Sequence, residues 1–402
     1  MTRLPDAAWL HWPELAAVVA ALTQDGGSAR YVGGAVRDTL LGLPVADVDL
    51  ATALRPAEVI AQLEAAAIKA VPTGIAHGTV TAVKDGRAFE VTTLRRDVAT
   101  DGRRATIAFA DDWQEDAARR DFTINALYAD PVSGAIFDWF GGTGDLAAGV
   151  VRFIGDPAQR IAEDHLRILR YYRFSARFGH GTSDGASHAA VVAARASLRT
   201  LSRERVADEL LKLLGLPRPL AAVEQMVGDR VLAEIVPEAD PAALDRLRTL
   251  ISNEAAAGSG PDALRRLAAL LPTVEASEAV AARLRLAKRQ RDRLAILVGQ
   301  RLSGLAIPVR HLAYAVGADA ARDCWLLGGT AQDQLVVESA LSGWRVPQLP
   351  VKGGALVARG VSAGPDVARL LRIIEQRWIA ADFPDGAALD ALVAHALGDA
   401  RQ

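Results

Sequence analysis

Residues 33–52, GGAVRDTLLGLPVADVDLAT, join a glycine turn, a helix and an aspartate-bearing strand, and this stretch decides the fold. The preceding run ARYV (29–32) predicts a strand that ends at Gly33, and helical spacing then continues to Gly42, which suits a helix end. The alternation of VADVDLAT (45–52) predicts a second strand. The sequence therefore predicts an α/β domain at the N-terminus.

Two aspartates, Asp47 and Asp49, stand two residues apart in that second strand. Alternate side chains of a strand share one face, so we expect their carboxylates to project together, about 6.5–7 Å apart. Paired carboxylates attract hard divalent cations such as Mg²⁺. Alone, an Asp-x-Asp pair is more often a solvated strand end.

The glycines before the helix suit an anion. Gly33 and Gly34 let backbone N–H groups approach a ligand closely, at a helix N-terminus that favours negative charge. Arg37, one turn into the helix, is placed to neutralise a phosphate. Gly-Gly before a helix is usually only a tight turn, but its succession by two aspartates favours a phosphate cradle beside a metal site. Nucleotidyl transfer by two metal ions needs that combination.

The run RRDFTINAL (119–127) has two interpretations. Arg120 is able to hold a triphosphate through two parallel hydrogen bonds. Alternatively, the charged residues lie on the surface at the start of a helix.

The run RIAEDHLRILRYYRFSARFG (160–179) predicts one helix, on which Asp164 and Arg167 are neighbours. Arg170 and Arg173 continue at the same spacing. The simple interpretation is an amphipathic helix with an ion pair and an arginine stripe. The sharper hypothesis is base recognition, because a carboxylate accepts from an exocyclic amine while a guanidinium donates to a ring nitrogen. Such a pair accepts CTP and ATP and rejects UTP and GTP.

Composition narrows the class of protein. Half of the 402 residues are hydrophobic and 23% are charged, which predicts a folded chain. The net charge of −2 excludes an overall basic nucleic-acid binder but allows a local basic patch. A single cysteine excludes an internal disulfide and a cysteine-based zinc site. No run of 18 apolar residues occurs, so we expect no membrane span and a soluble, cytoplasmic protein. We also expect no obligatory protein partner.

The pattern along the chain changes near residue 150. Before it, runs at 78–84 and 87–95 predict a hairpin with Asp85 and Gly86 in its turn. Residues 95–118 are polar and predict an irregular loop. After residue 150 the sequence is helical almost to its end.

Taken together, several motifs resemble those of class II CCA-adding tRNA nucleotidyltransferases and the related bacterial poly(A) polymerases. They are GGAVRDTLLGLPVADVDLAT, FEVTTLRRDVATDGRRATIAFADDWQEDAARRDFTINAL, FDWFGGTGDL and RIAEDHLRILRYYRFSARFG. The resemblance is strong over 29–179. It returns more weakly in GGALVARGVSAGPDVARLLRIIEQRWIAADFP (353–384).

The resemblance implies an α+β architecture. A nucleotidyltransferase (polymerase-beta-like) α/β head of residues 1–150 is followed by an all-α neck, body and tail. The neck, 151–215, recognises the nucleotide base, and the body and tail, 216–402, bind tRNA. The implied substrates are CTP, ATP and tRNA, held by its acceptor stem and elbow.

The resemblance also implies roles for single residues. Asp47 and Asp49 are the implied Mg²⁺ ligands, and Glu90 is an auxiliary carboxylate or a solvated residue. The implied nucleotide-binding residues are Gly33, Gly34, Arg37, Arg120, Asp164, Arg167, Arg170 and Arg173. Residues 97–111 correspond to a flexible loop that helps the switch from C to A addition.

The leading hypothesis is template-independent addition of C, C and A to the 3′ end of tRNA. Alternatives are a poly(A) polymerase, an enzyme that adds only CC or only A, and a catalytically silent RNA-binding protein. The arginine-rich segments 262–271 and 283–295 are either solvated helix faces or contacts to the tRNA backbone.

Overall fold

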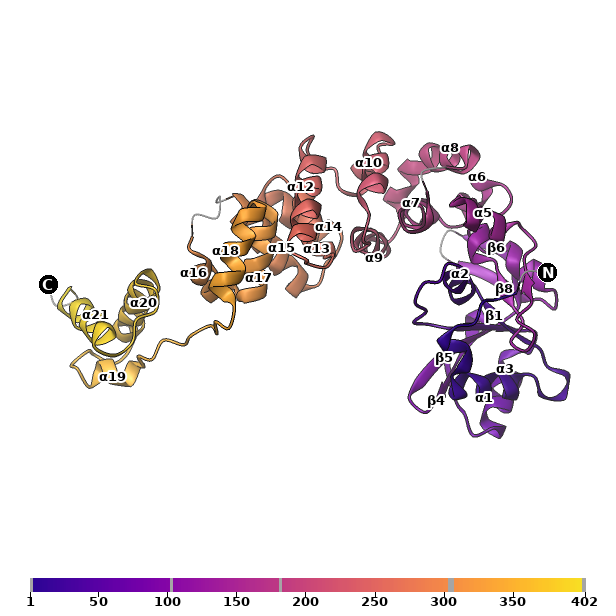
Figure 1. Ribbon diagram of the computed structural model, residues 1–402, viewed down its shortest axis with the longest axis horizontal. Coiled ribbons are helices and arrows are strands. Elements are labelled where there is room, and N and C mark those ends of the chain that lie inside the picture. The colour runs from indigo at the N-terminus through magenta and orange to yellow at the C-terminus, as the bar shows by residue number, and fades with distance from the viewer. Residues whose placement is uncertain (1–2, 102–103, 181–182, 303–306, 400–402) are drawn as a thin grey trace. The chain divides into compact units, whose positions relative to one another are not determined.

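A computed structural model describes residues 3–101, 104–180, 183–302 and 307–399. Two compact units make up the chain, Met1–Pro237 and Glu238–Gln402. Figure 1 labels their elements. None of the helices in these ranges is both long and apolar enough to cross a bilayer.

The first unit is built on a seven-stranded sheet of order β3-β4-β5-β2-β1-β8-β9. All neighbours are antiparallel except β2 and β5, which are parallel. The strands are β1 (Ala29–Val32), β2 (Asp49–Thr52), β3 (Lys69–Gly74), β4 (Thr79–Lys84), β5 (Arg87–Thr93), β8 (Tyr128–Ala129) and β9 (Ile136–Phe137).

The second strand is shorter than the predicted span 45–52. Its first residue, Asp49, pairs with Val32, the last residue of β1. Because the chain turns away at Gly33, residues before Asp49 have no strand partner on that side. The predicted β4–β5 hairpin is confirmed, and its turn residues Asp85 and Gly86 both have positive φ, 46° and 85°.

Helices cover the sheet and connect its strands. Both α1 (Pro13–Leu22) and α3 (Pro56–Ala65) begin with a proline, which suits a first helical turn, and both pack against β4. The short helix α2 (Gly34–Leu40) follows the glycine turn as predicted. The 3₁₀ turns are η1 (Ala8–His11), η2 (Gln24–Gly26), η3 (Ile75–His77), η4 (Thr123–Asn125) and η5 (Arg195–Thr200).

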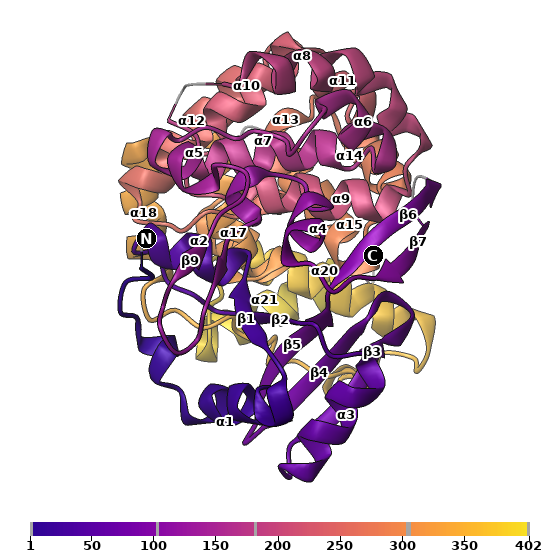
Figure 2. The ribbon, with the colours of Figure 1, turned by 90° about the vertical axis from the view of Figure 1, so that its right-hand side faces the viewer.

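The prediction of an irregular loop over 95–118 is wrong. This segment forms a hairpin of β6 (Arg95–Asp101) and β7 (Arg104–Phe109), followed by α4 (Trp113–Ala118). Figure 2 shows the hairpin apart from the main sheet, with which it does not pair. The polar composition of 95–118 gave no strand signal, although β6 and β7 pair with each other in a separate two-stranded sheet. Residues 102–103 of the loop lie outside the described ranges.

Seven helices complete the first unit. They are α5 (Gly142–Ala148), α6 (Pro157–Glu163), α7 (Arg167–Phe178), α8 (Gly185–Ala194), α9 (Arg203–Leu214), α10 (Leu220–Gly228) and α11 (Leu232–Ile235). The ring of Phe122 lies 4.7 Å from that of Phe153 and 5.3 Å from that of Phe174 on α7. This apolar contact fixes α7 against the segment that carries Arg120.

The described part of the second unit is entirely helical. Its helices are α12 (Ala243–Ala256), α13 (Ala263–Leu270), α14 (Val274–Arg283), α15 (Lys288–Leu302), α16 (Val309–Val316), α17 (Ala318–Gly328), α18 (Ala331–Leu341), α19 (Gly353–Val357), α20 (Pro365–Ala380) and α21 (Gly386–Asp399). Leu356, Ile374 and Val393 join the last three helices in one apolar cluster. The predicted fold class is confirmed: an α/β domain precedes a helical remainder.

Candidate active site

The predicted carboxylates lie on or just before two neighbouring interior strands of the main sheet. Asp49 begins β2, and Glu90 stands opposite it in the parallel neighbour β5. Val48 is buried while Asp47 and Asp49 are exposed, so the two aspartates lie on the same side although only Asp49 belongs to the strand. Partial burial and the charges of Glu90 and Asp47 raise the pKa of Asp49 to about 6, although Arg120 opposes them.

The glycine turn lies close to Asp49, because Val32, the residue before Gly33, pairs with Asp49. Gly33 has φ 70° and ψ −120°, a conformation that favours glycine, and its N–H donates to the Leu127 carbonyl at 3.0 Å. A Cβ added at Gly33 would lie 3.4 Å from Nη1 of Arg120. Glycine therefore leaves room for the arginine beside the turn.

Arg37 is more enclosed than the sequence suggested. Its Nε donates to Asp38 at 2.7 Å, its Nη1 donates to the Asn125 side chain, and its guanidinium lies 4.2 Å from the ring centre of Phe178. Burial lowers its pKa, although Asp38 opposes that effect. Arg37 thus forms part of the floor of the cleft described below, with most of its donors already bound.

Arg120 is positioned by two buried residues that the sequence analysis did not single out. Its Nε donates to the Tyr128 hydroxyl at 3.0 Å, and its Nη2 lies 3.3 Å from Asp116 Oδ2. The same carboxylate accepts from Arg119 and from the Tyr128 hydroxyl. Burial alone would raise the pKa of Asp116, but Arg120 and Arg119 hold it below its usual value.

On α7, two predicted arginines share the carboxylate of Glu209, and Arg170 has Asp121 as a second and closer partner. Arg170 donates from Nε to Asp121 Oδ2 at 2.7 Å, and this carboxylate raises the pKa of the half-buried Arg170 against the effect of desolvation. Arg173 donates to the buried Glu209 at 2.6 Å. Arg170 is therefore fixed in the cleft that Arg120 also lines, whereas Arg173, which does not line it, is neutralised one turn further along.

The single helix predicted for 160–179 is interrupted. The helix α6 ends at Glu163, Asp164 is extended (φ −152°, ψ 104°), and α7 begins at Arg167. The Asp164 carboxylate accepts from the Leu166 N–H at 3.1 Å and from Arg205 at 2.6 Å. The Asp164–Arg167 ion pair of the simple interpretation is not formed, because Asp164 pairs with Arg205 and Arg167 pairs with Glu163.

Arg167 instead binds groups on both sides of the break. Its Nη1 donates to Glu163 at 2.6 Å and to the Arg160 carbonyl at 2.7 Å. Its Nη2 donates to the carbonyl of Arg119 at 3.3 Å, which links α7 to the segment carrying Arg120. Asp164 and Arg167 thus lie side by side, each fixed by other partners.

These groups line one cleft of about 550 Å³ within the first unit. It gathers eight of the predicted residues: Gly33, Gly34, Arg37, Asp49, Arg120, Asp164, Arg167 and Arg170. Asp47, Glu90 and Arg173 are not among the described residues that line it. The lining contains seven arginines and three aspartates. A cleft with this excess of guanidinium groups suits a polyphosphate.

Seven lining residues were not predicted: Arg95, Arg119, Asp121, Asn125, Leu166, Phe174 and Arg205. Arg119, Asp121 and Asn125 lie in the quoted run 119–127, so their neighbourhood was a usable signal. Arg205 comes from α9, 41 residues after its partner Asp164. No local pattern pointed to that contact.

Comparison with known proteins identifies the family of the chain. Residues 29–152 match the family described as the poly A polymerase head domain, and residues 184–243 match a probable RNA and SrmB-binding site of polymerase A. The chain is 32% identical over 387 residues to the Mus musculus protein named CCA tRNA nucleotidyltransferase 1, mitochondrial, covering 93% of this chain and 88% of that protein. It is 34% identical over 375 residues to the CCA-adding enzyme of Lacticaseibacillus paracasei, covering 90% of each.

Solved structures show the same architecture. The crystal structure of the Bacillus stearothermophilus CCA-adding enzyme in complex with CTP matches with a TM-score of 0.79 and 25% identity, over 97% of this chain and 99% of that one. The Thermotoga maritima CCA-adding enzyme complexed with tRNA shares the fold, with a TM-score of 0.71, 21% identity and coverage of 99% and 100%.

The polymerase-beta-like head and its homologues define the class of protein: it is a nucleotidyltransferase. Within that class, the chain belongs to the family of CCA-adding tRNA nucleotidyltransferases.

Proposed function

We propose that this protein adds C, C and A to the 3′ end of tRNA without a nucleic-acid template, using CTP and ATP. The observation that carries the proposal is the single cleft in which Asp49, Arg120 and the adjacent Asp164 and Arg167 meet. Membership of the CCA-adding family supports the choice of product.

Asp47 and Asp49 are the proposed Mg²⁺ ligands, with Glu90 as an auxiliary carboxylate. The described residues contain no group of three or more acidic, histidine or cysteine side chains arranged to hold a metal. Two carboxylates are nevertheless a suitable donor set, because Mg²⁺ in nucleotide enzymes takes its remaining ligands from phosphates and water. Burial, together with the charges of Glu90 and Asp47, raises the pKa of Asp49, and a bound cation would favour its ionised form. Asp47 and Asp49 would hold the metal ions, whose chemistry there would be to lower the pKa of the attacking hydroxyl and to offset the charge of the leaving pyrophosphate.

The protein's own contribution to the phosphates is binding and orientation. Arg120 and Arg170 are held by buried carboxylates, so little reorganisation is needed when they donate to a triphosphate. We propose the same role for Gly33 and Gly34 through their backbone N–H groups, and a supporting positive charge for Arg37.

Base selection is proposed for Asp164 and Arg167. The Asp164 carboxylate has lone pairs left after its contacts to Leu166 and Arg205, and these can accept from the exocyclic amine of cytosine or adenine. Arg167 donates to the ring nitrogen beside that amine. Uracil and guanine present the inverse pattern and leave both groups unmatched, which disfavours them.

For the remaining domains we propose a neck, 151–215, that recognises the base, and a body and tail, 216–402, that bind the acceptor stem and elbow of tRNA. The matched RNA-binding region at 184–243 supports an RNA substrate. We propose a cytoplasmic location.

The test supplies purified protein and Mg²⁺ with a tRNA that lacks its 3′ CCA, all four nucleoside triphosphates, and sequencing of the products. The proposal predicts added CCA followed by termination. A long A tail, CC alone or A alone indicates one of the sister activities. Retained tRNA binding without addition by an intact protein indicates a catalytically silent RNA-binding protein.

A further inference from the structure

The segment 283–293, RLRLAKRQRDR, is the most basic stretch of the chain. Six of its eleven residues are lysine or arginine, and only Asp292 is acidic. It spans the end of α14 and the first turns of α15. The sequence alone leaves open whether its cations are solvated, paired within the protein or available to a ligand.

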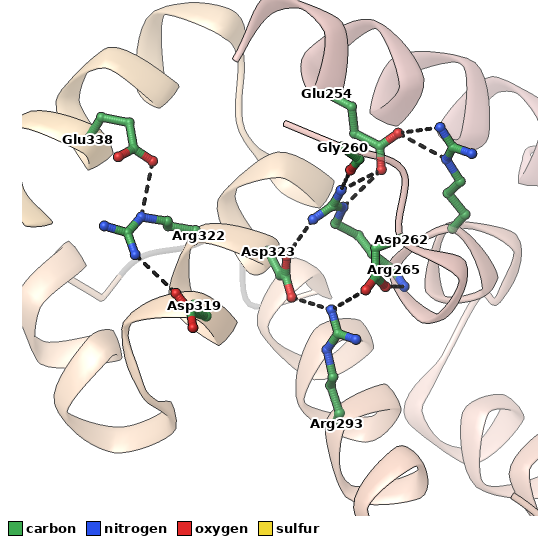
Figure 3. Close-up of polar contacts among 10 residues, drawn as sticks. Glu254, Gly260, Asp262, Arg265, Arg293, Asp319, Arg322, Asp323 and Glu338 are labelled. Carbon is green, nitrogen blue, oxygen red and sulfur yellow. Dashed lines mark hydrogen bonds and ion pairs between the residues drawn. The ribbon is translucent and has the colours of Figure 1, made fainter. Parts of the chain in front are cut away.

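The other arginine-rich segment, 262–271, does not offer free cations. Arg265 and Arg266 are only 4% and 2% exposed, and both donate to the buried carboxylate of Glu254. Arg265 also donates to Asp323 at 2.5 Å (Figure 3). These arginines are neutralised inside the second unit.

Three of the six cations in 283–293, namely Arg283, Arg285 and Arg293, have interaction partners within the protein. Arg283 binds Glu238, with one N–O contact of 2.6 Å. Arg293 binds Asp323 at 2.5 Å and Asp262 at 2.9 Å, as Figure 3 shows. These ion pairs fasten both ends of the segment to the rest of the unit.

Three exposed cations without such partners lie between them. The side chains of Lys288, Arg289 and Arg291 have no hydrogen bond or ion pair with any residue in the described ranges. Lys288 and Arg289 border a cleft of about 880 Å³ that also includes Asp292 and Asp319. Asp319 is bound by Arg322 and Asp323 by Arg265 and Arg293 (Figure 3), so Asp292 is the carboxylate left to offset the cations among the described residues that line this cleft.

The position of these cations works against the helix that carries them. They occupy the first turns of α15, where the helix dipole disfavours positive charge, and the first turn has no acidic residue. A local arrangement that lowers helix stability is expected where the residues serve a ligand. Because these side chains are positively charged, their ligand is expected to be an anion. Three separate cations suit a ligand with several negative charges, a polyanion.

We propose that Lys288, Arg289 and Arg291 form a surface that binds the phosphate backbone of the RNA substrate. The inference rests on the proposed function, because that function supplies the polyanion. Phosphate contacts fix the orientation of an RNA without reading its sequence. Since the whole chain has a net charge of only −2, binding must come from a local surface of this kind.

The experiment compares the full-length wild type with Lys288→Gln/Arg289→Gln and with the triple variant that adds Arg291→Gln. The affinity for tRNA lacking its 3′ CCA is measured between about 50 and 200 mM salt. We expect the Kd of the triple variant to rise about 10- to 100-fold. The slope of log affinity against log salt should become shallower by about one for each phosphate that the variant no longer neutralises.

Two further readouts separate a binding surface from a structural role. The kcat at saturating tRNA should equal that of the wild type. The Tm should not fall, because the variants remove charges that oppose the helix dipole. A lower Tm together with weaker binding would instead assign these side chains to the fold and overturn the proposal.

The matched control is Arg345→Gln/Lys352→Gln, which removes two other exposed cations of the same unit. It should change affinity and salt slope far less than Lys288→Gln/Arg289→Gln. Equal effects of the two double variants, or wild-type binding by the triple variant, would overturn the proposed surface. If the wild type binds tRNA but adds no nucleotide, the proposed function fails, whereas the binding measurements still decide the surface.

Discussion

The Tyr128 hydroxyl donates a 2.5 Å hydrogen bond to the buried carboxylate of Asp116. The same hydroxyl accepts from Nε of Arg120, while Asp116 forms an ion pair with that guanidinium. The phenol and the carboxylate thus hold Arg120 at the wall of the cleft. The orientation of a proposed phosphate-binding arginine depends on two residues that need not touch the nucleotide.

Replacing Tyr128 with phenylalanine should therefore weaken nucleotide binding. Arg120 loses one acceptor and the buried Asp116 loses one donor, so we expect KM for CTP and ATP to rise about 10-fold and stability to fall by about 1–2 kcal/mol. Steady-state kinetics and denaturant unfolding measure both effects. An unchanged KM with the expected loss of stability would show that the pair supports the fold alone.

Replacing Asp49 with asparagine should remove catalysis and spare RNA binding. We expect nucleotide incorporation to fall at least about 100-fold, because a proposed metal-binding carboxylate is lost. The affinity for tRNA should stay within about twofold. Turnover close to that of the wild type would contradict the assignment of Asp49.

The raised pKa of Asp49, about 6, predicts a pH-dependent difference in stability. A carboxyl group whose pKa is higher in the folded state disfavours folding once it ionises. Without metal, wild type should therefore lose stability relative to Asp49→Asn as the pH rises from about 4 to about 7. Below about pH 4 the two proteins should unfold alike.

Chemical unfolding across this pH range, in the presence of a chelator, measures that difference. Added Mg²⁺ should reduce it, because a cation favours the ionised carboxylate. The control Glu115→Gln, at an exposed carboxylate outside the cleft, should show no such trend. A trend of the opposite sign would contradict the raised pKa.

Substitutions at Asp164 and Arg167 should alter selectivity more than rate. We expect Asp164→Asn or Arg167→Ala to reduce the preference for CTP over UTP by about 10- to 100-fold, since each removes one of two base contacts. Competition assays with paired nucleotides provide the measurement. Glu163→Gln, which keeps Arg167 but weakens its support, should give a smaller loss. If Asp164→Asn kept the full preference for CTP over UTP, base recognition would belong to other residues.

The buried ion network of the second unit predicts a large effect on stability. Glu254→Ala leaves Arg265 and Arg266 without their shared carboxylate, and we expect a loss of about 3–5 kcal/mol. Arg322→Gln, which breaks more exposed ion pairs, should cost less than about 1 kcal/mol. Similar unfolding midpoints for the two variants would contradict this distinction.

Local sequence patterns predicted much of the fold. Alternation located β2, β-rich runs located β4 and β5, and the Asp85–Gly86 pair located the hairpin turn, because a two-residue turn has its own backbone preference. The break at Asp164 was missed, because helical spacing continues across it. At the break, the Asp164 carboxylate contacts Arg205, which lies 41 residues further along the chain.

The site was predictable to the same extent. Asp49 and Arg120 stand in motifs with a chemical rationale. The residues that position Arg120 do not stand in such motifs. Asp116 acts through contacts with Arg120 and Tyr128 that only the folded chain brings together. Arg173 was expected in the cleft from its helical spacing, but its carboxylate partner Glu209 comes from another helix.

The most direct test of the central claim is the order of nucleotide addition. Three tRNAs, ending before CCA, after the first C and after the second C, are each incubated with one labelled nucleoside triphosphate at a time. Our account predicts incorporation of C, C and A in turn, without use of UTP or GTP and without growth beyond A. Addition of A to the first tRNA, repeated A addition to the third, or incorporation of U or G would contradict it.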